Sequence, residues 1–190
     1  AFAPHLPPGA PGLHAVLHGP EAAALLARPS LAQPAHAALG VALAALWQAR
    51  GLAPALVLGH SLGECIAAHV AGVLDLDGLA RLVAGRGRLC EALAPGGMAA
   101  TTAQATEVAA ALARLPPGLA SEAGLAACHG SAGSTVSGSP AALAALRAAL
   151  AEAGHASEPL GGRHAYHSPL TAPAMAPLAA LAAGIPHGAP

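Results

Sequence analysis

Lysine and asparagine are absent from this chain of 190 residues, and only 9% of its residues are charged. All eight basic residues are therefore arginines, and the net charge is −1. A protein that binds nucleic acid normally carries a basic patch or stripe. Because the sequence has none, we expect no nucleic-acid partner.

Long apolar runs are also missing, although 55% of the residues are hydrophobic. A membrane span needs about 18 or more consecutive apolar residues, whereas the best run, residues 37–47, is shorter. No basic segment precedes an apolar stretch as it would in a signal peptide. The three cysteines are scattered and odd in number, which suits a reduced protein better than a disulfide framework. We expect no membrane partner and a cytoplasmic location.

Metal ligands are not gathered in the sequence either. Among the 11 histidines, His14 and His18 form one pair with a chelating spacing, and His164 and His167 form another. Both pairs lie in Pro- and Gly-rich stretches and lack cysteine or carboxylate partners, whereas zinc sites use three or four converging ligands. We expect no metal site.

What is present is an α/β pattern. Apolar residues at helical spacing follow Pro34, and the short apolar run 55–58 is typical of a buried strand of a parallel sheet. Asp77 can cap a later helix. Residues 1–97 and 161–190 are assigned to a larger subdomain. Between them we predict a strand-helix-strand-strand-helix-strand series, the order of a ferredoxin-like subdomain, at 98–103, 106–114, 124–128, 134–138, 139–153 and 156–160.

The segment Gly59-His60-Ser61-Leu62-Gly63 lies between a predicted strand and a predicted helix, where a nucleophile elbow belongs. The serine of an elbow sits on a strained turn, and flanking glycines avoid collisions there. The turn leaves the N–H of Leu62 to stabilise an oxyanion. A plain tight turn is the alternative, but the context favours Ser61 as a nucleophile in an α/β-hydrolase-like larger subdomain with a parallel sheet.

A serine nucleophile needs a base, and the histidines supply candidates. Acidic residues to complete a triad are scarce. The only aspartates are Asp75 and Asp77, and no acidic residue follows Glu158. The sequence therefore favours a Ser–His dyad over a Ser–His–Asp triad.

Arg86 lies seven residues after Leu79, about two helical turns, and so falls on the apolar face of its predicted helix. A buried arginine needs a partner, because an unpaired charge is costly. It can form a structural ion pair, extend along the apolar surface to water, or grip a substrate carboxylate with two hydrogen bonds. Helical spacing alone leaves these alternatives open.

Together these motifs resemble the acyltransferase domain of polyketide synthases, which is similar to the malonyl-CoA:acyl-carrier-protein transacylases of fatty acid synthesis. The resemblance covers about residues 3–183. It rests on the sequences at 32–35 (AQPA), 59–64 (GHSLGE), 68–74 (AHVAGVL), 81–89 (RLVAGRGRL), 134–138 (STVSG) and 164–169 (HAYHSP).

The resemblance implies a role for each matching residue. Ser61 matches the serine that carries the acyl group, and His167 matches the histidine of the dyad. Arg86 matches the arginine that pairs with the carboxylate of a malonyl unit. Leu62 matches the residue whose N–H helps to form the oxyanion hole, and Gln33 matches a glutamine near the site.

The substrate-binding candidates also include His60, next to the nucleophile, and the pair His164 and Tyr166. The tetrad His164-Ala165-Tyr166-His167 resembles the His-Ala-Phe-His type linked to malonyl, with tyrosine in place of phenylalanine. A bulky ring would crowd an α-methyl branch, and one methyl group is worth about 1–3 kcal/mol. The resemblance therefore favours malonyl over methylmalonyl.

The resemblance further implies malonyl-CoA as donor, an acyl carrier protein as partner, a flanking ketosynthase and no bound cofactor. Residues 1–58 lack the Gly-Gln-Gly-Ser-Gln-like segment of the family, and the family's C-terminal part is missing. The sequence thus looks like a domain truncated at both ends. Two alternatives stay open, a serine esterase or thioesterase-type hydrolase and an inactive acyltransferase fragment.

Overall fold

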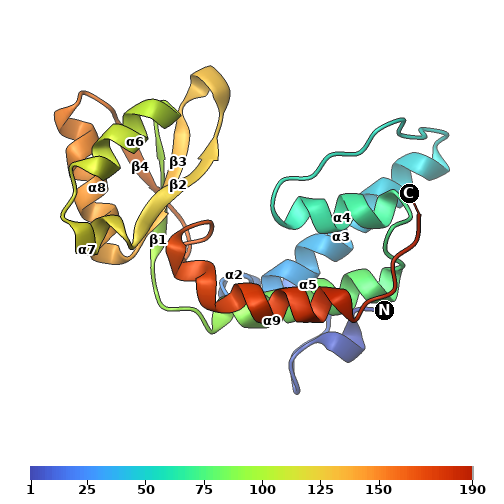
Figure 1. Ribbon diagram of the computed structural model, residues 1–190. Coiled ribbons are helices and arrows are strands. Elements are labelled where there is room, and N and C mark those ends of the chain that lie inside the picture. Colours follow the sequence, from blue (N-terminus) through green and yellow to red (C-terminus); the bar gives the residue numbers. More distant parts are fainter. Residues whose placement is uncertain (190) are drawn as a thin grey trace. The chain divides into compact units, whose positions relative to one another are not determined.

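A computed structural model describes residues 1–189, and the contacts divide the chain into two compact units. The helical unit contains Ala1–Ala92 and the C-terminal segment from Ala176, and the sheet unit is Leu93–Met175 (Figure 1). The sheet unit is longer than the insertion 98–160 expected from the sequence. One reason is that residues on both sides of that insertion bond to each other, since the Gly96 N–H donates to the Arg163 carbonyl at 2.9 Å.

The helical unit combines short N-terminal helices with three longer ones. α3 begins at Pro29, not at Pro34, in keeping with the preference for proline at the first helical position, and Pro34 lies buried inside the helix. A Cβ on Gly87 would lie 2.5 Å from the Pro29 carbonyl oxygen, so α3 and α5 approach closely. The elements are η1 (Ala3–His5), α1 (Leu13–His18), α2 (Ala22–Leu26), α3 (Pro29–Ala49), α4 (Leu62–Val70), α5 (Leu76–Glu91) and the end of α9 (Ala172–Ala183).

α3 is long and apolar enough to cross a membrane by length and composition, with a mean hydropathy of 1.2. One such helix is weak evidence, because the core helix of a soluble protein meets the same criterion. Leu31 and Ala35 of α3 are buried against Val16 of α1, and Ala37 is buried in a cluster with Leu79 of α5. These contacts bury the first part of α3 inside its own unit, whereas 33% of its apolar window is buried overall.

The N-terminus of α3 is held by Glu91 at the end of α5. One carboxylate oxygen accepts the Ser30 N–H at 3.0 Å, and the other accepts Arg28 Nε at 3.1 Å. Burial acts to raise the pKa of the Glu91 carboxyl, but hydrogen bonds from Ser30 and Arg28 outweigh it, so the pKa lies below its ordinary value. This contact of Glu91 with Arg28 and Ser30, the Glu91 clamp, was not predicted from the sequence, because its partners lie about sixty residues apart.

Replacing Glu91 by glutamine is expected to lower the stability of the α3 N-terminus by about 1 kcal/mol at neutral pH, because the charge at the helix end is lost. The folded pKa of Glu91 lies below the unfolded one. Its contribution is therefore complete above an unfolded pKa of 4.5 and is lost as the pH falls through the folded pKa. Hydrogen exchange of the α3 amides measures the difference between wild type and Glu91→Gln, which should shrink as the pH falls below 4.5. Glu152→Gln, which breaks an exposed pair with Arg114, is the control. Equal exchange of wild type and Glu91→Gln at pH 7 would contradict the clamp.

The prediction that Asp77 caps α5 is wrong, because the helix begins at Leu76 and the cap is Asp75. The Asp75 backbone is extended, and its Oδ1 accepts the Gly78 N–H at 2.6 Å. Asp77 lies in the first turn and contacts His5 Nε2 at 3.0 Å, and this hydrogen bond lowers the pKa of its carboxyl. Two aspartates spaced by two residues offered the same local signal, and the backbone conformation decided between them.

The strand expected at 55–58 is not formed in the described chain, and Leu56 and Leu58 are 87% and 94% exposed. A strand needs a neighbour to satisfy its backbone N–H and C=O groups, and no segment of residues 1–189 pairs with this one. Instead it lines, with α3 and α4, an apolar pocket of about 650 Å³. Leu39 and Trp47, on the predicted apolar face of α3, are about half exposed.

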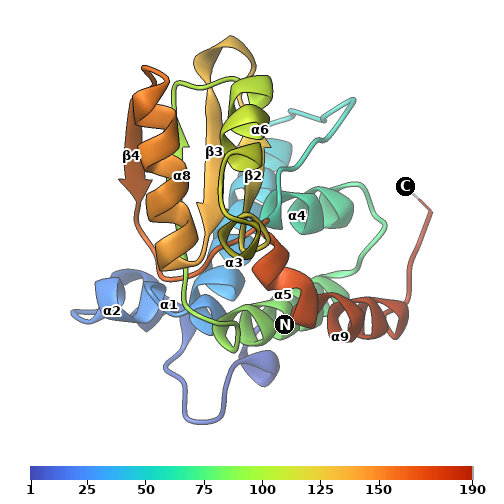
Figure 2. The same ribbon diagram turned by 60° about the vertical axis from the view of Figure 1, so that its left-hand side comes forward.

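The sheet unit contains the six predicted elements in the predicted order, with short helical turns added. The strands form one antiparallel sheet in the order β2-β3-β1-β4. Helices α6 and α8 cover one face of this sheet, as Figure 2 shows, over a core that includes Val136 and Leu146. The elements are β1 (Gly97–Thr101), α6 (Ala105–Ala113), α7 (Pro117–Ala120), β2 (Ala123–Cys128), η2 (Gly130–Ala132), β3 (Ser134–Gly138), α8 (Pro140–Glu152), β4 (Ser157–Leu160) and η3 (Pro169–Thr171).

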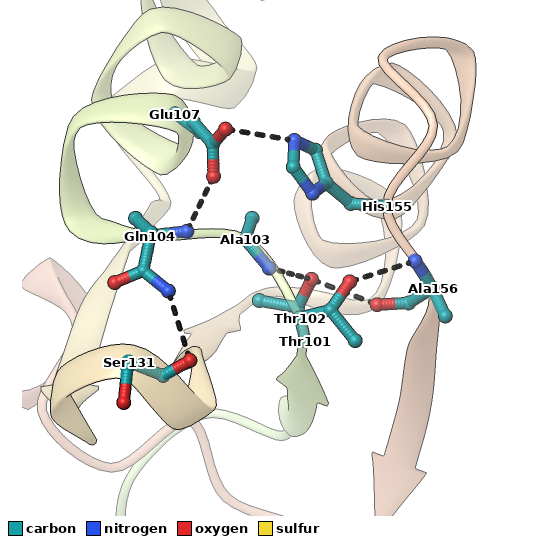
Figure 3. A network of polar contacts seen from close by, with 8 residues as sticks. All are labelled: Thr101, Thr102, Ala103, Gln104, Glu107, Ser131, His155 and Ala156. Atoms are coloured by element: carbon teal, nitrogen blue, oxygen red, sulfur yellow. Dashed lines mark hydrogen bonds and ion pairs between the residues drawn. The ribbon is translucent and has the colours of Figure 1, made fainter.

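A polar network fastens one end of this sheet (Figure 3). Thr101, at the end of β1, donates its hydroxyl to the Ala156 carbonyl at 2.9 Å, just before β4. Glu107 accepts the Gln104 N–H at 2.7 Å as part of a capping box at the start of α6, and its other oxygen contacts His155 at 3.4 Å. This end of the sheet is thus fixed by several bonds, and the segment with His164 and His167 follows β4 at the opposite end.

Candidate functional site

Ser61 has the backbone conformation of a strained turn. Its φ is 55° and its ψ is −114°, and it is the N-cap of α4. A Cβ on Gly59 would lie 2.1 Å from the Gly63 carbonyl carbon, so only glycine fits at position 59. A Cβ on Gly63 would meet nothing within 4 Å. A side chain was expected to collide at both glycines that flank Ser61. Of these two, only Gly59 has such a collision.

Within residues 1–189, only two non-glycine residues have a positive φ, and they are Ser61 and His167 (φ 60°). Such a conformation costs an L-residue about 1–3 kcal/mol and persists where the surroundings impose it, often at functional sites. The two strained positions are those of Ser61, the candidate nucleophile, and His167, the base that the resemblance implies.

Arg86 reaches Ser61 and Gln33 with the two ends of its guanidinium group. Nη2 donates to Ser61 Oγ at 3.0 Å, and Nη1 donates to Gln33 Oε1 at 2.7 Å. Gln33 is only 7% exposed. No carboxylate of the described residues forms an ion pair with Arg86. Of the alternatives left open by helical spacing, the structural ion pair is therefore not found, and the positive charge stays uncompensated beside the serine.

The packing of two helices fixes this arrangement. Gln33 comes from α3 and Arg86 from α5, and these helices approach closely where Gly87 faces the Pro29 carbonyl. Glu91 of α5 also joins the two helices, because its carboxylate accepts the Ser30 N–H of α3 about one turn beyond Arg86. Arg86 is therefore anchored from the side of α3, and its second donor is directed to the start of α4.

The neighbours of Ser61 on α4 complete this group. Leu62 is the first residue of α4, a position whose N–H has no partner within a helix, as an oxyanion donor requires. The His60 carbonyl accepts the Gly63 N–H at 2.9 Å and so supports the turn. Cys65 lies one turn after Ser61; burial raises the pKa of its thiol, and the charge of Arg86 partly opposes this. Cys65 could not be predicted from the sequence because a lone cysteine forms no motif.

His164, Tyr166 and His167 lie in the sheet unit, in the segment that follows β4. Pro95 and His164 form an antiparallel bridge, and the rings of His164 and Tyr166 are 5.7 Å apart. Ala165 is buried, and its carbonyl accepts the Ser168 hydroxyl at 2.7 Å. The backbone around His167 is therefore held on both sides.

The predicted site residues thus fall into two groups. The helical unit carries Ser61 with Leu62, Gln33, His60 and Arg86, and the sheet unit carries the other three. No three His, Cys, Asp or Glu side chains of residues 1–189 gather closely enough to hold a metal ion.

Comparisons with known proteins agree with these observations. A family model described as "Acyl transferase domain" matches residues 11–190. Over 87% of its own length, the chain is 45% identical to the mycoketide-CoA synthase of Mycobacterium tuberculosis. The matched part is only 4% of that synthase. It is 40% identical to the acyltransferase domain from the second module of the salinomycin polyketide synthase, with a TM-score of 0.79, covering 87% of this chain and 38% of that one.

A third match is a type II polyketide synthase acyl-carrier protein in complex with its malonyl-transacylase. The identity is 30% and the TM-score is 0.84, over 93% of this chain and 58% of that one. The chain therefore spans between about two fifths and three fifths of these two solved structures.

Proposed function

The chain belongs to the acyl transferase domain family, and we propose that it forms part of an enzyme that moves a malonyl unit from CoA to an acyl carrier protein through a seryl ester. The observation that carries this proposal is the contact between Arg86 Nη2 and Ser61 Oγ at 3.0 Å. It puts a guanidinium with no carboxylate partner beside a serine on a strained turn. A donor with a free carboxylate next to its reactive carbonyl suits both groups at once.

The first half-reaction acylates Ser61. Its Oγ attacks the thioester carbonyl of malonyl-CoA while His167 accepts the hydroxyl proton. The negative oxygen of the tetrahedral intermediate accepts the Leu62 N–H at the start of α4. The C–S bond then breaks, and the CoA thiolate takes the proton from His167. A thiol leaves readily, since its pKa is near 8.5.

The second half-reaction returns the acyl group to a thiol. The phosphopantetheine thiol of the carrier protein gives its proton to His167 and attacks the seryl ester. The ester C–O bond breaks, and Ser61 recovers its proton from His167, so that the kinetics are ping-pong. No resident cofactor is needed, because the donor brings its own thioester. The solved complex of a carrier protein with its malonyl-transacylase supports a carrier as acceptor, and a neighbouring ketosynthase stays a prediction.

Tyr166 supports malonyl over methylmalonyl as the acyl unit. Its ring lies tilted against that of His164, with the ring centroids 5.7 Å apart, in a segment whose backbone is fixed, which limits how far the ring can move aside. One excluded methyl group corresponds to a preference of about 10- to 200-fold.

We also propose that residues 55–58 form a strand of a parallel α/β-hydrolase-like sheet in the full-length protein. This segment is apolar, exposed in the described chain and directly followed by the Ser61 turn. A buried strand before the turn is the usual context of a nucleophile elbow.

The test is to incubate the full-length protein with malonyl-CoA and to measure intact mass and the Ser61 peptide. We expect a malonyl adduct on Ser61 that is stable until a holo-carrier protein is added and then passes to it. Equal amounts of malonyl-CoA and methylmalonyl-CoA should give mainly the malonyl adduct. Rapid release to water without a carrier would indicate a hydrolase, and no adduct would indicate an inactive domain; either result would contradict the proposal.

A further inference from the structure

Arg163 differs from the other arginines in having no partner for its side chain among residues 1–189. It is exposed, and only its backbone carbonyl takes part in a hydrogen bond, with Gly96. The other seven contact a carboxylate, a carbonyl or amide oxygen, a hydroxyl or an aromatic ring: Arg28, Arg50, Arg81, Arg86, Arg88, Arg114 and Arg147.

The backbone that carries Arg163 is fixed although its side chain is not. The Gly96 N–H donates to the Arg163 carbonyl at 2.9 Å, and the next residue, His164, bridges to Pro95. A Cβ on Gly96 would lie 2.6 Å from the Ala165 Cβ, so the two segments pack tightly. The guanidinium therefore projects from a rigid base and can bind a ligand without ordering a loop first.

Arg163 lies four residues before His167, so the two Cα atoms are at most about 14 Å apart. A ligand that places a reacting group at His167 can reach the Arg163 side chain with its other end when a flexible arm of similar length extends along residues 163–167. Its position suits recognition of the distant end of such an arm.

Within the described chain, Arg163 is an unpaired positive charge in a unit that is slightly negative overall. The sheet unit, residues 93–175, contains three arginines against four glutamates, for a net charge of −1. Arg114 is paired with Glu152, and Arg147 donates to Ser157. Arg163 is then the one arginine of the described sheet unit whose donors are unused. A guanidinium presents a planar pair of donors that matches a phosphate.

We propose that Arg163 binds the phosphate of the phosphopantetheine arm as its thioester or thiol reaches His167. This inference rests on the proposed function, in which CoA and the carrier protein present the same arm in turn. The shared chemistry is a phosphate ester at the end of the arm remote from sulfur. Arg163 thereby contributes to binding both substrates and takes no part in the bond-making step.

The test compares malonyl-CoA, malonyl-phosphopantetheine and malonyl-pantetheine, which lacks phosphate, as donors for the full-length protein. Arg163→Gln is expected to raise KM about 10-fold for the two phosphorylated donors, to leave malonyl-pantetheine unchanged and to keep kcat. The rise should shrink at high salt, because the contact is exposed. Arg114→Gln, on the same unit but already paired, is the control and should change none of these values.

The carrier half-reaction distinguishes the two sources of phosphate. A rise in KM for holo-carrier as well as for malonyl-phosphopantetheine supports binding of the shared phosphate. A rise confined to malonyl-CoA would assign Arg163 to the nucleotide, and a rise confined to the carrier would assign it to the carrier surface. Either of these outcomes, or an equal effect on malonyl-pantetheine, overturns the proposal.

A binding measurement separates this inference from the proposed function. Calorimetric titration of CoA and of pantetheine into full-length Ser61→Ala requires no turnover. We expect Arg163→Gln to weaken CoA binding about 10-fold in that background and to leave pantetheine unchanged. This result would stand even if no malonyl adduct forms, whereas normal malonyl transfer with unaltered CoA binding would overturn the inference alone.

Discussion

Replacing Ser61 by alanine is expected to remove the malonyl adduct and to lower transfer to the carrier by about 10⁴-fold or more, the scale seen when a serine nucleophile is deleted. Alanine keeps the Cβ and with it the strain of the turn at φ 55°, so the fold should be unaffected. Intact mass and a transfer assay on the full-length protein measure both effects.

A second substitution at the same position separates chemistry from strain. Ser61→Gly should also abolish the adduct, but it should raise the stability of the turn by about 1 kcal/mol, because glycine tolerates a positive φ. Ser121→Ala, which removes an exposed hydroxyl bonded to the Gly118 carbonyl, is the matched control and should transfer normally. A Ser61→Ala protein that still carries malonyl at another residue would show that the nucleophile is misassigned.

The sheet unit was predictable because its signals are local. Each strand and helix between β1 and β4 is bounded by turn residues, and each finds its partners within the same unit. The segment 55–58 has an equally clear apolar pattern, yet it forms no strand in residues 1–189. A strand depends on a neighbour that supplies hydrogen bonds, and a local pattern cannot say whether that neighbour lies within the sequence.

The candidate site residues could be named from the sequence and the resemblance, but their contacts could not. The pattern around Ser61 identified the turn, but the sequence could not show that only Gly59 is sterically required, since this depends on how α4 begins. The resemblance pointed to His167, whereas its positive φ is a property of the folded backbone that the sequence does not show. The partners of Arg86 were open because Gln33 lies 53 residues away, on a helix whose approach depends on Gly87.

The position of Arg86 between Gln33 and Ser61 leads to the second prediction with a large expected effect. Arg86→Ala is expected to reduce malonyl loading by about 100- to 1000-fold, because two hydrogen bonds to a charged group contribute about 1.5–3 kcal/mol each and are not fully additive. The acetyl group has no carboxylate that could bind Arg86, so the rate of acetyl loading should change little. Rates of adduct formation with malonyl-CoA and acetyl-CoA measure the two. Arg88→Ala, on the same helix and bonded to the His5 carbonyl, is the matched control.

A substitution of Gln33, which accepts a hydrogen bond from the other end of the Arg86 guanidinium, also tests whether Arg86 binds the malonyl carboxylate. A carboxylate at this position would pair with Arg86 and compete with the malonyl carboxylate, so Gln33→Glu should weaken malonyl loading in the direction of Arg86→Ala. Arg86→Lys should recover only part of the rate, because an ammonium cannot hold Gln33 and the substrate in one planar fork. Equal losses of malonyl and acetyl loading in Arg86→Ala would make the arginine a support for Ser61. The acyl selectivity would then have to come from elsewhere in the site.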